Sequence, residues 1–177
     1  FGLIVLAMIY TLGHISGAHL NPAVTLAFFS TGRHPTKEMA PYMIAQLTGA
    51  VVASVTLRFI FSGHSTTLGA TLPAESWIQS FAMEFVLTFM LMFVIMGVAH
   101  DDRAEGLMAG VAIGATITLE AIFGGPISGA SMNPARSFAP ALVSGNFQSH
   151  WIYWAAPILG SITGAQVYQL IRKEVPR

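Results

Sequence analysis

The sequence Ile15-Ser16-Gly17-Ala18-His19-Leu20-Asn21-Pro22-Ala23 returns 112 positions later as Ile127-Ser128-Gly129-Ala130-Ser131-Met132-Asn133-Pro134-Ala135. Glycines outside this stretch keep the same register, because Gly2 and Gly13 correspond to Gly114 and Gly125. A near-constant offset over so much of the chain indicates that one half is a duplicate of the other. Each copy lies between hydrophobic segments, which is typical of transporters and channels built from two halves.

The composition favours a membrane protein and argues against several other classes. The chain is 54% hydrophobic and 9% charged, against roughly 25% charged residues in soluble domains. Its formal net charge is zero, so no basic field favours nucleic acid. The absence of cysteine excludes disulfides, thiol nucleophiles and thiolate metal sites. The sequence contains no nucleophile–base pair, no phosphate-binding loop and no histidine spacing typical of a metal site. We therefore expect neither an enzyme nor a cofactor.

Five apolar segments are predicted to cross a bilayer, which takes about 20 helical residues. They are Phe1–Leu12, which is short, Pro41–Phe61, Ser76–Ala99, Leu107–Phe123 and Trp151–Ile171. Two shorter apolar pieces, Pro22–Phe29 and Pro134–Val143, each begin at the proline of an Asn-Pro pair. Asparagine as cap and proline at the first helical position are a helix start signal. Each piece is therefore predicted to be a half-helix that enters the membrane without crossing it.

The distribution of basic residues predicts the orientation. Lysine and arginine occur in the loops at 31–40 and 100–106 and in the C-terminal tail, but not in the loop at 62–75. By the positive-inside rule the first three are cytoplasmic and residues 62–75 lie outside. The two half-helices then enter from opposite faces, which makes the fold an inverted repeat. We predict a first repeat at 1–61, an external loop at 62–75 and a second repeat at 76–177.

The two predicted repeats are unequal in length. The second repeat begins with the segment Ser76–Ala99, which has no counterpart in the first repeat. Mapped back by the repeat offset, that counterpart falls before Phe1. We therefore expect one further transmembrane helix upstream of the sequence, which would give the complete protein six crossings.

The repeated stretch predicts a pore for uncharged solutes. Two opposed half-helices would meet near the bilayer midplane, and each N-terminus carries roughly half a positive charge, which repels cations. Asn21 and Asn133 are expected to cap these ends through their side-chain oxygens, leaving their NH₂ groups directed at the space between the helices. Extended backbone before each cap would line a path with carbonyl acceptors. The residues concerned are Gly17, Ala18, His19, Leu20, Gly129, Ala130, Ser131 and Met132.

Arg136 follows Asn133 on the first turn of the second half-helix. An arginine in a membrane segment is costly and is taken as functional by default. The structural alternative is an ion pair, but no acidic residue lies near it in the sequence. We predict that Arg136 donates hydrogen bonds to a passing solute and forms a charge barrier near the outer mouth. The corresponding position in the first repeat is Val24.

Three features carry a resemblance to a known family: the two Asn-Pro-Ala boxes (Asn21, Pro22, Ala23 and Asn133, Pro134, Ala135), the run from His14 to Thr25, and the sequence Asn133-Pro134-Ala135-Arg136-Ser137. With these features the chain resembles the aquaporin, or major intrinsic protein, family over essentially its whole length. The resemblance implies an all-α membrane fold with two re-entrant half-helices. It also implies a homotetramer with one pore per subunit, and passive flow of water or small neutral solutes without ions or protons. The family's selectivity filter falls here on Phe1, Ala121, Ala130 and Arg136.

The filter residues indicate a branch of the family. Strict water channels usually have histidine at the Ala121 position, whereas Ala121 and Ala130 are small and widen the constriction. Glycerol facilitators usually have aspartate where this chain has Ser137. The combination resembles the nodulin-26-like branch and its bacterial relatives, which pass glycerol, urea or metalloid acids as well as water. Many family members are blocked by mercurials through a cysteine at the position of Ala130.

Two glutamates lie within predicted crossings. By the resemblance, Glu84 is a structural buried acid that accepts hydrogen bonds from re-entrant loop backbone. Glu120 has two readings: a second carboxylate satisfied by loop backbone, or a titratable group near the filter.

The leading hypothesis is that the protein is a passive channel, which crosses the plasma membrane several times and has its C-terminus in the cytoplasm. Its alternatives are a strict water channel and a closed-pore membrane scaffold protein.

Overall fold

A computed structural model of the chain describes residues 1–62, 67–99 and 108–174. These residues form seven α-helices and no strand. The helices are α1 (Gly2–Ser16), α2 (Pro22–Ser30), α3 (Thr36–Ile60), α4 (Trp77–Ala99), α5 (Ala109–Ser128), α6 (Pro134–Ser144) and α7 (Ile152–Glu174). Both half-helices are present as predicted, each beginning at the proline of its Asn-Pro pair. The predicted all-α class is confirmed.

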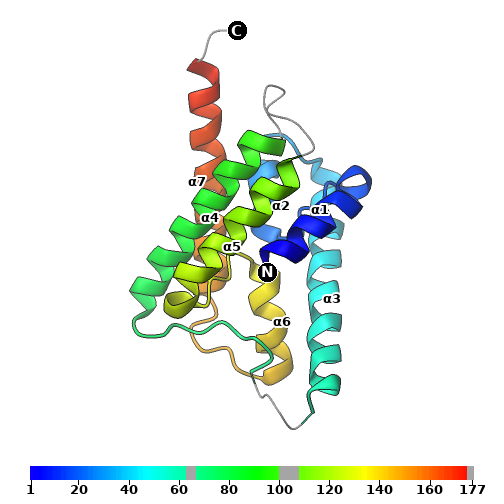
Figure 1. Ribbon diagram of the computed structural model, residues 1–177, viewed down its shortest axis with the longest axis vertical. Coiled ribbons are helices and arrows are strands. Elements are labelled where there is room, and N and C mark those ends of the chain that lie inside the picture. Colours follow the sequence, from blue (N-terminus) through cyan, green and yellow to red (C-terminus); the bar gives the residue numbers. More distant parts are fainter. Residues whose placement is uncertain (63–66, 100–107, 175–177) are drawn as a thin grey trace.

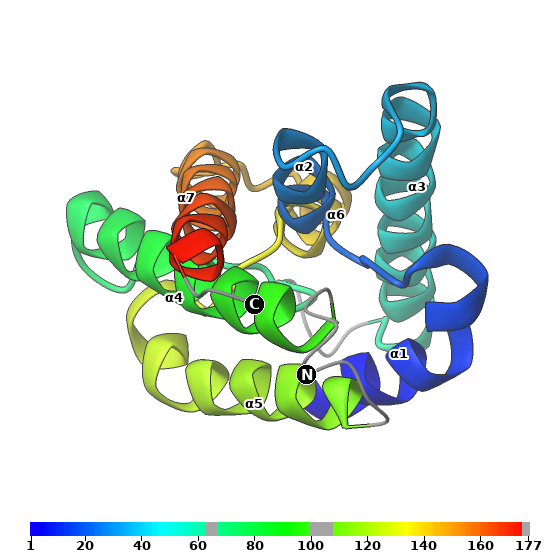
Figure 2. The ribbon, with the colours of Figure 1, turned by 90° about the horizontal axis from the view of Figure 1, so that it is seen from above.

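The two short helices lie between α7 and α3 (Figure 2). In the view from above, α1, α5, α4 and α7 follow one another around the molecule and α3 stands at the other side (Figure 2). The short helices α2 and α6 overlap in that view but lie at different heights in Figure 1, so they are stacked end to end. Helix α7 ends at one end of the molecule, and α3 ends at the other (Figure 1).

The packing of the short helices is reciprocal. Helix α2, from the first half of the chain, packs along α7, the last helix of the second half. Helix α6, from the second half, packs along α3, the last helix of the first half. Each half therefore packs its short helix against the last helix of the other half, and this reciprocal packing is consistent with the inverted repeat that the sequence predicts.

Membrane-spanning character is clearest in three helices. Among the described residues, α3, α4 and α5 are long and apolar enough to cross a bilayer. Helix α1 has only 15 residues. Helix α7 has 23 residues but is not among the three, and it carries two glutamines with structural partners. The amides of Gln166 and Gln169 donate to the carbonyls of Ser30 and Thr31, at the end of α2.

Three predicted helix boundaries were wrong by four or five residues. Helix α1 continues past Leu12 to Ser16. Helix α3 begins at Thr36 rather than at Pro41, because a proline this close to a helix start removes only one backbone hydrogen bond. Helix α5 continues past Phe123 through Gly124, Gly125 and Pro126. Tertiary packing holds this end, since a Cβ at Gly124 would lie 2.7 Å from a methyl of Leu87. The helix stops at Gly129, whose positive φ of 85° forms the C-cap.

Glycines set the close approach of several helix pairs. A Cβ added at Gly160 or Gly164 of α7 would lie 2.3 or 2.4 Å from backbone oxygens of α4. At Gly114 of α5 it would lie 2.7 Å from the carbonyl oxygen of Gly2 on α1. Small residues at such crossings allow the close backbone packing on which membrane helices depend. These glycines therefore pack the helices closely against one another.

Glu84 connects α4 to the loop before α6. One carboxylate oxygen accepts from the Ser128 hydroxyl and the Ser131 amide, and the other accepts from the Met132 amide, all at 2.7 Å. The side chain is completely buried. Three donors converging on one carboxylate stabilise its ionised form. The structural role expected for Glu84 therefore rests on observed contacts.

Glu120 on α5 differs from Glu84. It is only 3% exposed, and neither of its carboxyl oxygens has a hydrogen-bond partner in the part of the chain that the structure describes. The reading that loop backbone satisfies Glu120 is therefore wrong for these residues. Burying an ionised carboxylate without a partner is very costly, so we infer that Glu120 is held as the neutral acid.

These two glutamates should respond differently to the same substitution. Glu84→Gln replaces one acceptor oxygen by an NH₂ group that faces backbone donors, and it should destabilise the protein by about 2–4 kcal/mol. Glu120→Gln exchanges one neutral, unpartnered group for another and should leave stability nearly unchanged. Thermal unfolding of both variants in the same detergent measures the difference. A comparable loss in both would contradict the neutral assignment of Glu120.

Candidate functional site

The two Asn-Pro-Ala boxes begin the short helices and place their N-termini against each other. Asn21 has an extended backbone, and its Oδ1 accepts from the amide of Ala23 at 2.9 Å. Asn133 does the same with the amides of Ala135 and Arg136, at 3.0 and 3.3 Å. The capping predicted from the Asn-Pro pairs is therefore confirmed.

The asparagine amides also bond across the two halves. Asn21 Nδ2 donates to the Met132 carbonyl at 2.7 Å, and Asn133 Nδ2 donates to the Leu20 carbonyl at 2.8 Å. Each NH₂ group, expected to face the space between the helices, therefore uses one donor on the loop of the other half. Because an amide NH₂ carries two donors, each asparagine keeps one N–H beyond these contacts.

The loops before the two boxes have the same unusual backbone. Positive φ angles recur at Gly17, Ala18 and Leu20 in the first loop, and at the corresponding Gly129, Ala130 and Met132 in the second. Non-glycine residues in this region are strained, and such strain concentrates at functional sites. The repeat therefore preserves a backbone geometry as well as a sequence.

Several N–H groups of these loops bond to side chains that do not line the cavity described below. The His19 amide donates to the Tyr42 hydroxyl at 3.1 Å, and the amides of Ser131 and Met132 donate to Glu84. With these donors engaged, what the loops present elsewhere is mainly carbonyl oxygen. The line of carbonyl acceptors stays a prediction, and two of its members, Leu20 and Met132, already accept from the asparagines.

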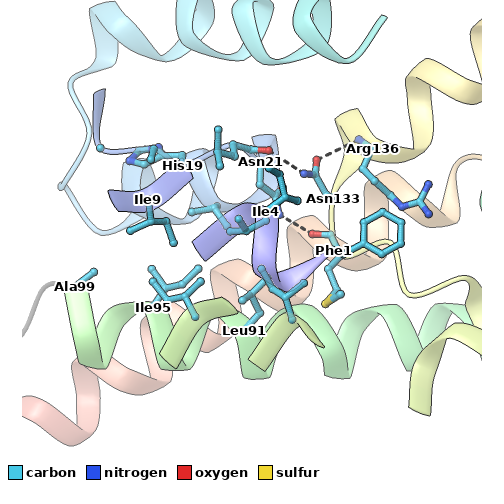
Figure 3. A pocket seen from close by; sticks show the side chains of 18 of the residues that line it. Phe1, Ile4, Ile9, His19, Asn21, Leu91, Ile95, Ala99, Asn133 and Arg136 are labelled. Atoms are coloured by element: carbon cyan, nitrogen blue, oxygen red, sulfur yellow. Dashed lines mark hydrogen bonds between the residues drawn. The ribbon is translucent and has the colours of Figure 1, made fainter. Parts of the chain in front are cut away.

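A cavity of about 200 Å³ lies between the loops and the long helices. One wall is polar and contains both asparagines, Arg136 and all but one of the eight predicted carbonyl residues, Gly129 being the exception. The opposite wall is apolar and comes from α1, α4 and α5. Figure 3 shows Ile4 and Ile9 on one side and Leu91 and Ile95 on another, with Asn21 and Asn133 between Arg136 and His19. A polar stripe facing an apolar wall can hydrogen-bond to a line of water molecules without binding an ion tightly.

Three of the four predicted filter residues line this cavity, namely Phe1, Ala130 and Arg136. Phe1 and Arg136 lie at the same end (Figure 3), where the Arg136 guanidinium carbon is 4.8 Å from the centroid of the Phe1 ring. Ala121 is half-buried on α5 and is not among the lining residues. It follows Ile113 and Ile117 at helical spacing, and those two do line the cavity. A methyl group at this place is too short to form part of the wall.

The guanidinium of Arg136 bonds to a carbonyl that the sequence did not indicate. Its Nη1 donates to the carbonyl of Gly69, in the segment between α3 and α4. Sequence reasoning considered only a carboxylate partner or a solute. The available signal was a glycine in the short stretch that connects the repeats, and this is too common a feature to have been decisive.

His19 lies at the other end of the same cavity. Its ring centroid is 4.6 Å from that of Phe28, 5.0 Å from Tyr42 and 5.1 Å from His34, and its Nδ1 lies 3.1 Å from the Thr25 hydroxyl. The sequence assigned His19 only a backbone carbonyl. Within the described ranges, no three histidine, aspartate or glutamate side chains group as metal ligands would.

Comparisons with known proteins agree with this geometry. The family model described as "MIP: Major intrinsic protein" matches residues 1–168. Aquaporin NIP1-1 of Zea mays is 54% identical over 172 residues, which cover 97% of this chain and 61% of that protein. Nodulin-26 of Glycine max is 52% identical over 172 residues, covering 97% of this chain and 64% of its own length. The chain thus spans less than two thirds of the length of these two relatives.

A solved structure has the same fold. The X-ray structure of the aquaglyceroporin from Plasmodium falciparum superposes with a TM-score of 0.83 and 26% sequence identity, covering 97% of this chain and 79% of that one. The family match over nearly the whole chain and the half-identical relatives agree with the paired boxes and the opposed half-helices. The chain belongs to the major intrinsic protein family, the aquaporins.

Proposed function

We propose that the protein is a passive transmembrane channel for water and small uncharged solutes, such as glycerol, urea or metalloid acids. The observation that carries the proposal is the meeting of Asn21 and Asn133 on the wall of one cavity, each with one N–H to spare. Two donors at one place, with carbonyl acceptors beside them and an apolar wall opposite, suit a neutral molecule that accepts and donates hydrogen bonds.

Exclusion of ions and protons follows from the charges around that point. The N-termini of α2 and α6 face each other, and both helix dipoles present their positive ends there. Arg136 adds a full positive charge at one end of the cavity. A cation would have to lose hydration without gaining a compensating carboxylate, so its passage is opposed at two successive positions.

The proposed filter consists of Phe1, Ala121, Ala130 and Arg136. Two of these four side chains are methyl groups, so the constriction would be wide on the side of Ala121 and Ala130. The resemblance to Nodulin-26 and to an aquaglyceroporin structure favours solutes larger than water. This combination supports a channel for a small polyol or a metalloid acid in addition to water.

The setting of the channel is part of the same proposal. Large apolar side chains lie exposed on several helices, with Leu3 77%, Phe59 83% and Ile122 70% accessible, and a lipid bilayer would cover them. We propose repeats at 1–61 and 76–177 joined by an external loop at 62–75, a cytoplasmic C-terminus in the plasma membrane, and a homotetramer as in the family.

Stopped-flow measurements on proteoliposomes test the function directly. The permeabilities to water, glycerol, urea and boric or arsenious acid are measured in parallel, with empty vesicles as the control. A separate measurement follows the decay of an imposed proton gradient in the same proteoliposomes. Rapid swelling with water and at least one solute, without dissipation of the gradient, supports the proposal. Flux of water alone would favour the strict water channel, and no flux above empty vesicles would favour a closed-pore scaffold.

Ala121→His should separate water from the larger solutes. An imidazole in line with Ile113 and Ile117 would reach the cavity that the methyl group does not, so it should narrow the constriction opposite Arg136. We expect solute flux to fall about tenfold or more and water flux to fall much less. Ala121→Ser, which adds a hydroxyl with little volume, is the matched control. Equal losses of water and solute in the histidine variant would contradict a role in selectivity.

Mercury should leave the native channel unaffected, because the chain contains no cysteine. Ala130 lies on the cavity wall, so a thiol placed there would bind mercury inside the narrow part of the path. Ala130→Cys should therefore make water flux mercury-sensitive, and excess thiol should reverse the block. The control is a cysteine at exposed Thr163 on α7. Inhibition of the unmodified protein would contradict this prediction.

A further inference from the structure

The segment before α4 makes a strained turn beside Arg136. The Ala70 amide donates to the Thr67 carbonyl at 2.8 Å, and the two residues between them, Leu68 and Gly69, have positive φ angles of 51° and 75°. Positive φ at both central positions is typical of a type I′ turn. Leucine is unfavourable in this region, so the turn persists only because its surroundings hold it. We refer to residues 67–70 as the outer turn.

The outer turn supplies the carbonyl that meets the filter arginine. Gly69 is the second central residue of the turn, and its carbonyl accepts from Arg136 Nη1. Leu68 is 6% exposed, so its side chain is buried while its neighbour's carbonyl is presented to the guanidinium. The turn therefore determines where one N–H group of Arg136 is held.

A buried pair of hydroxyls fixes the chain directly after the turn. The hydroxyls of Thr71 and Ser137 hydrogen-bond at 2.6 Å, and Thr71 is 5% and Ser137 1% exposed. Ser137 follows Arg136 in the sequence, and Thr71 lies two residues after Gly69. The pair therefore joins the two backbone segments whose relative position determines whether the carbonyl can meet the guanidinium.

The pair is part of a longer buried network. Ser137 also bonds to the Ser131 hydroxyl, and that hydroxyl donates to the Asn133 carbonyl at 2.9 Å. Nearby, the Tyr153 hydroxyl donates to the Ser128 carbonyl at 2.8 Å, in the same re-entrant loop. A Cβ at Gly129 would lie 3.0 Å from Thr71 Cγ2, so the threonine packs closely against the re-entrant loop. Such fully partnered networks make one geometry strongly preferred.

We propose that Thr71 and Ser137 are positioning residues for selectivity: their hydrogen bond holds the outer turn so that the Gly69 carbonyl fixes the orientation of Arg136. The proposal rests on the proposed channel function, in which Arg136 lines the constriction. An arginine has several rotatable bonds and loses much side-chain freedom when ordered. Without the hydroxyl pair the outer turn can move away from Arg136, and the guanidinium can then adopt several orientations. The width of the constriction would vary with them.

The test compares hydroxyl removal with hydroxyl retention at the same position. Thr71→Val keeps the shape and removes the hydroxyl, Thr71→Ser keeps the hydroxyl, and Ser137→Ala removes its partner. The matched control is Thr56→Val on α3, where the hydroxyl bonds only to its own helix, at the Val52 carbonyl. The readout is the ratio of glycerol to water permeability in proteoliposomes, together with thermal stability in detergent.

We expect Thr71→Val and Ser137→Ala each to change the permeability ratio about three- to tenfold. The double variant should resemble either single variant, since both remove the same bond. Thr71→Ser and Thr56→Val should keep the native ratio. An unchanged ratio in Thr71→Val, or an equal loss of both permeabilities with lowered stability, would overturn the proposal and leave a purely structural role.

A second readout does not depend on conduction. Phenylglyoxal modification of Arg136, followed by mass spectrometry of the full chain, reports how freely the guanidinium moves. Modification should be several-fold faster in Thr71→Val than in the native protein or in Thr56→Val. If native vesicles show no flux but this difference is present, the channel proposal fails while the positioning of Arg136 stands. Equal modification rates would overturn the positioning of Arg136.

Discussion

Two half-helices that end inside a membrane must satisfy their backbone groups without water. In this fold the requirement is met by two asparagines, each of which serves both halves of the chain. Asn21 caps its own helix with its oxygen and bonds to the opposite loop with its nitrogen, and Asn133 does the same in return. Because non-helical backbone at membrane depth is tolerated only in such surroundings, the remaining architecture depends on this reciprocal pair.

The exchange of short helices between the halves follows from the same constraint. For the two N-termini to face each other, α2 and α6 must lie on one line, and each then packs against the last helix of the other half. Ser161 on α7 shows the connection in detail, because its hydroxyl donates to the Ala23 carbonyl of the first box at 2.9 Å. Neither half can place its half-helix without the other, so the cavity between them and the fold form together.

What the sequence could predict was local or periodic. The Asn-Pro pairs predicted the caps and helix starts, and the constant offset predicted the inverted repeat. The missed features involve contacts between distant segments. Nothing near Arg136 in the sequence indicates that Gly69 will meet it, and nothing near Glu120 indicates that its carboxyl will lack a partner. The continuation of α5 through Pro126 likewise depends on packing against α4, which local propensity does not reveal.

The repeat is symmetric in backbone but not in charge, and the difference has a physical reason. Val24 occupies the position that corresponds to Arg136. Its side chain is only 2% exposed, packs in the core and also borders the cavity. Arg136 has a carbonyl partner only because the segment joining the halves passes over its end of the cavity. The loop after α2 leads directly into α3, and His34 of this loop and Tyr42 of α3 pack against His19 instead. An arginine at position 24 would therefore be desolvated with no comparable acceptor. The inverted repeat thus builds one cavity with an arginine at one end and none at the corresponding position of the other, and the segment that breaks the symmetry is the one that connects the two repeats.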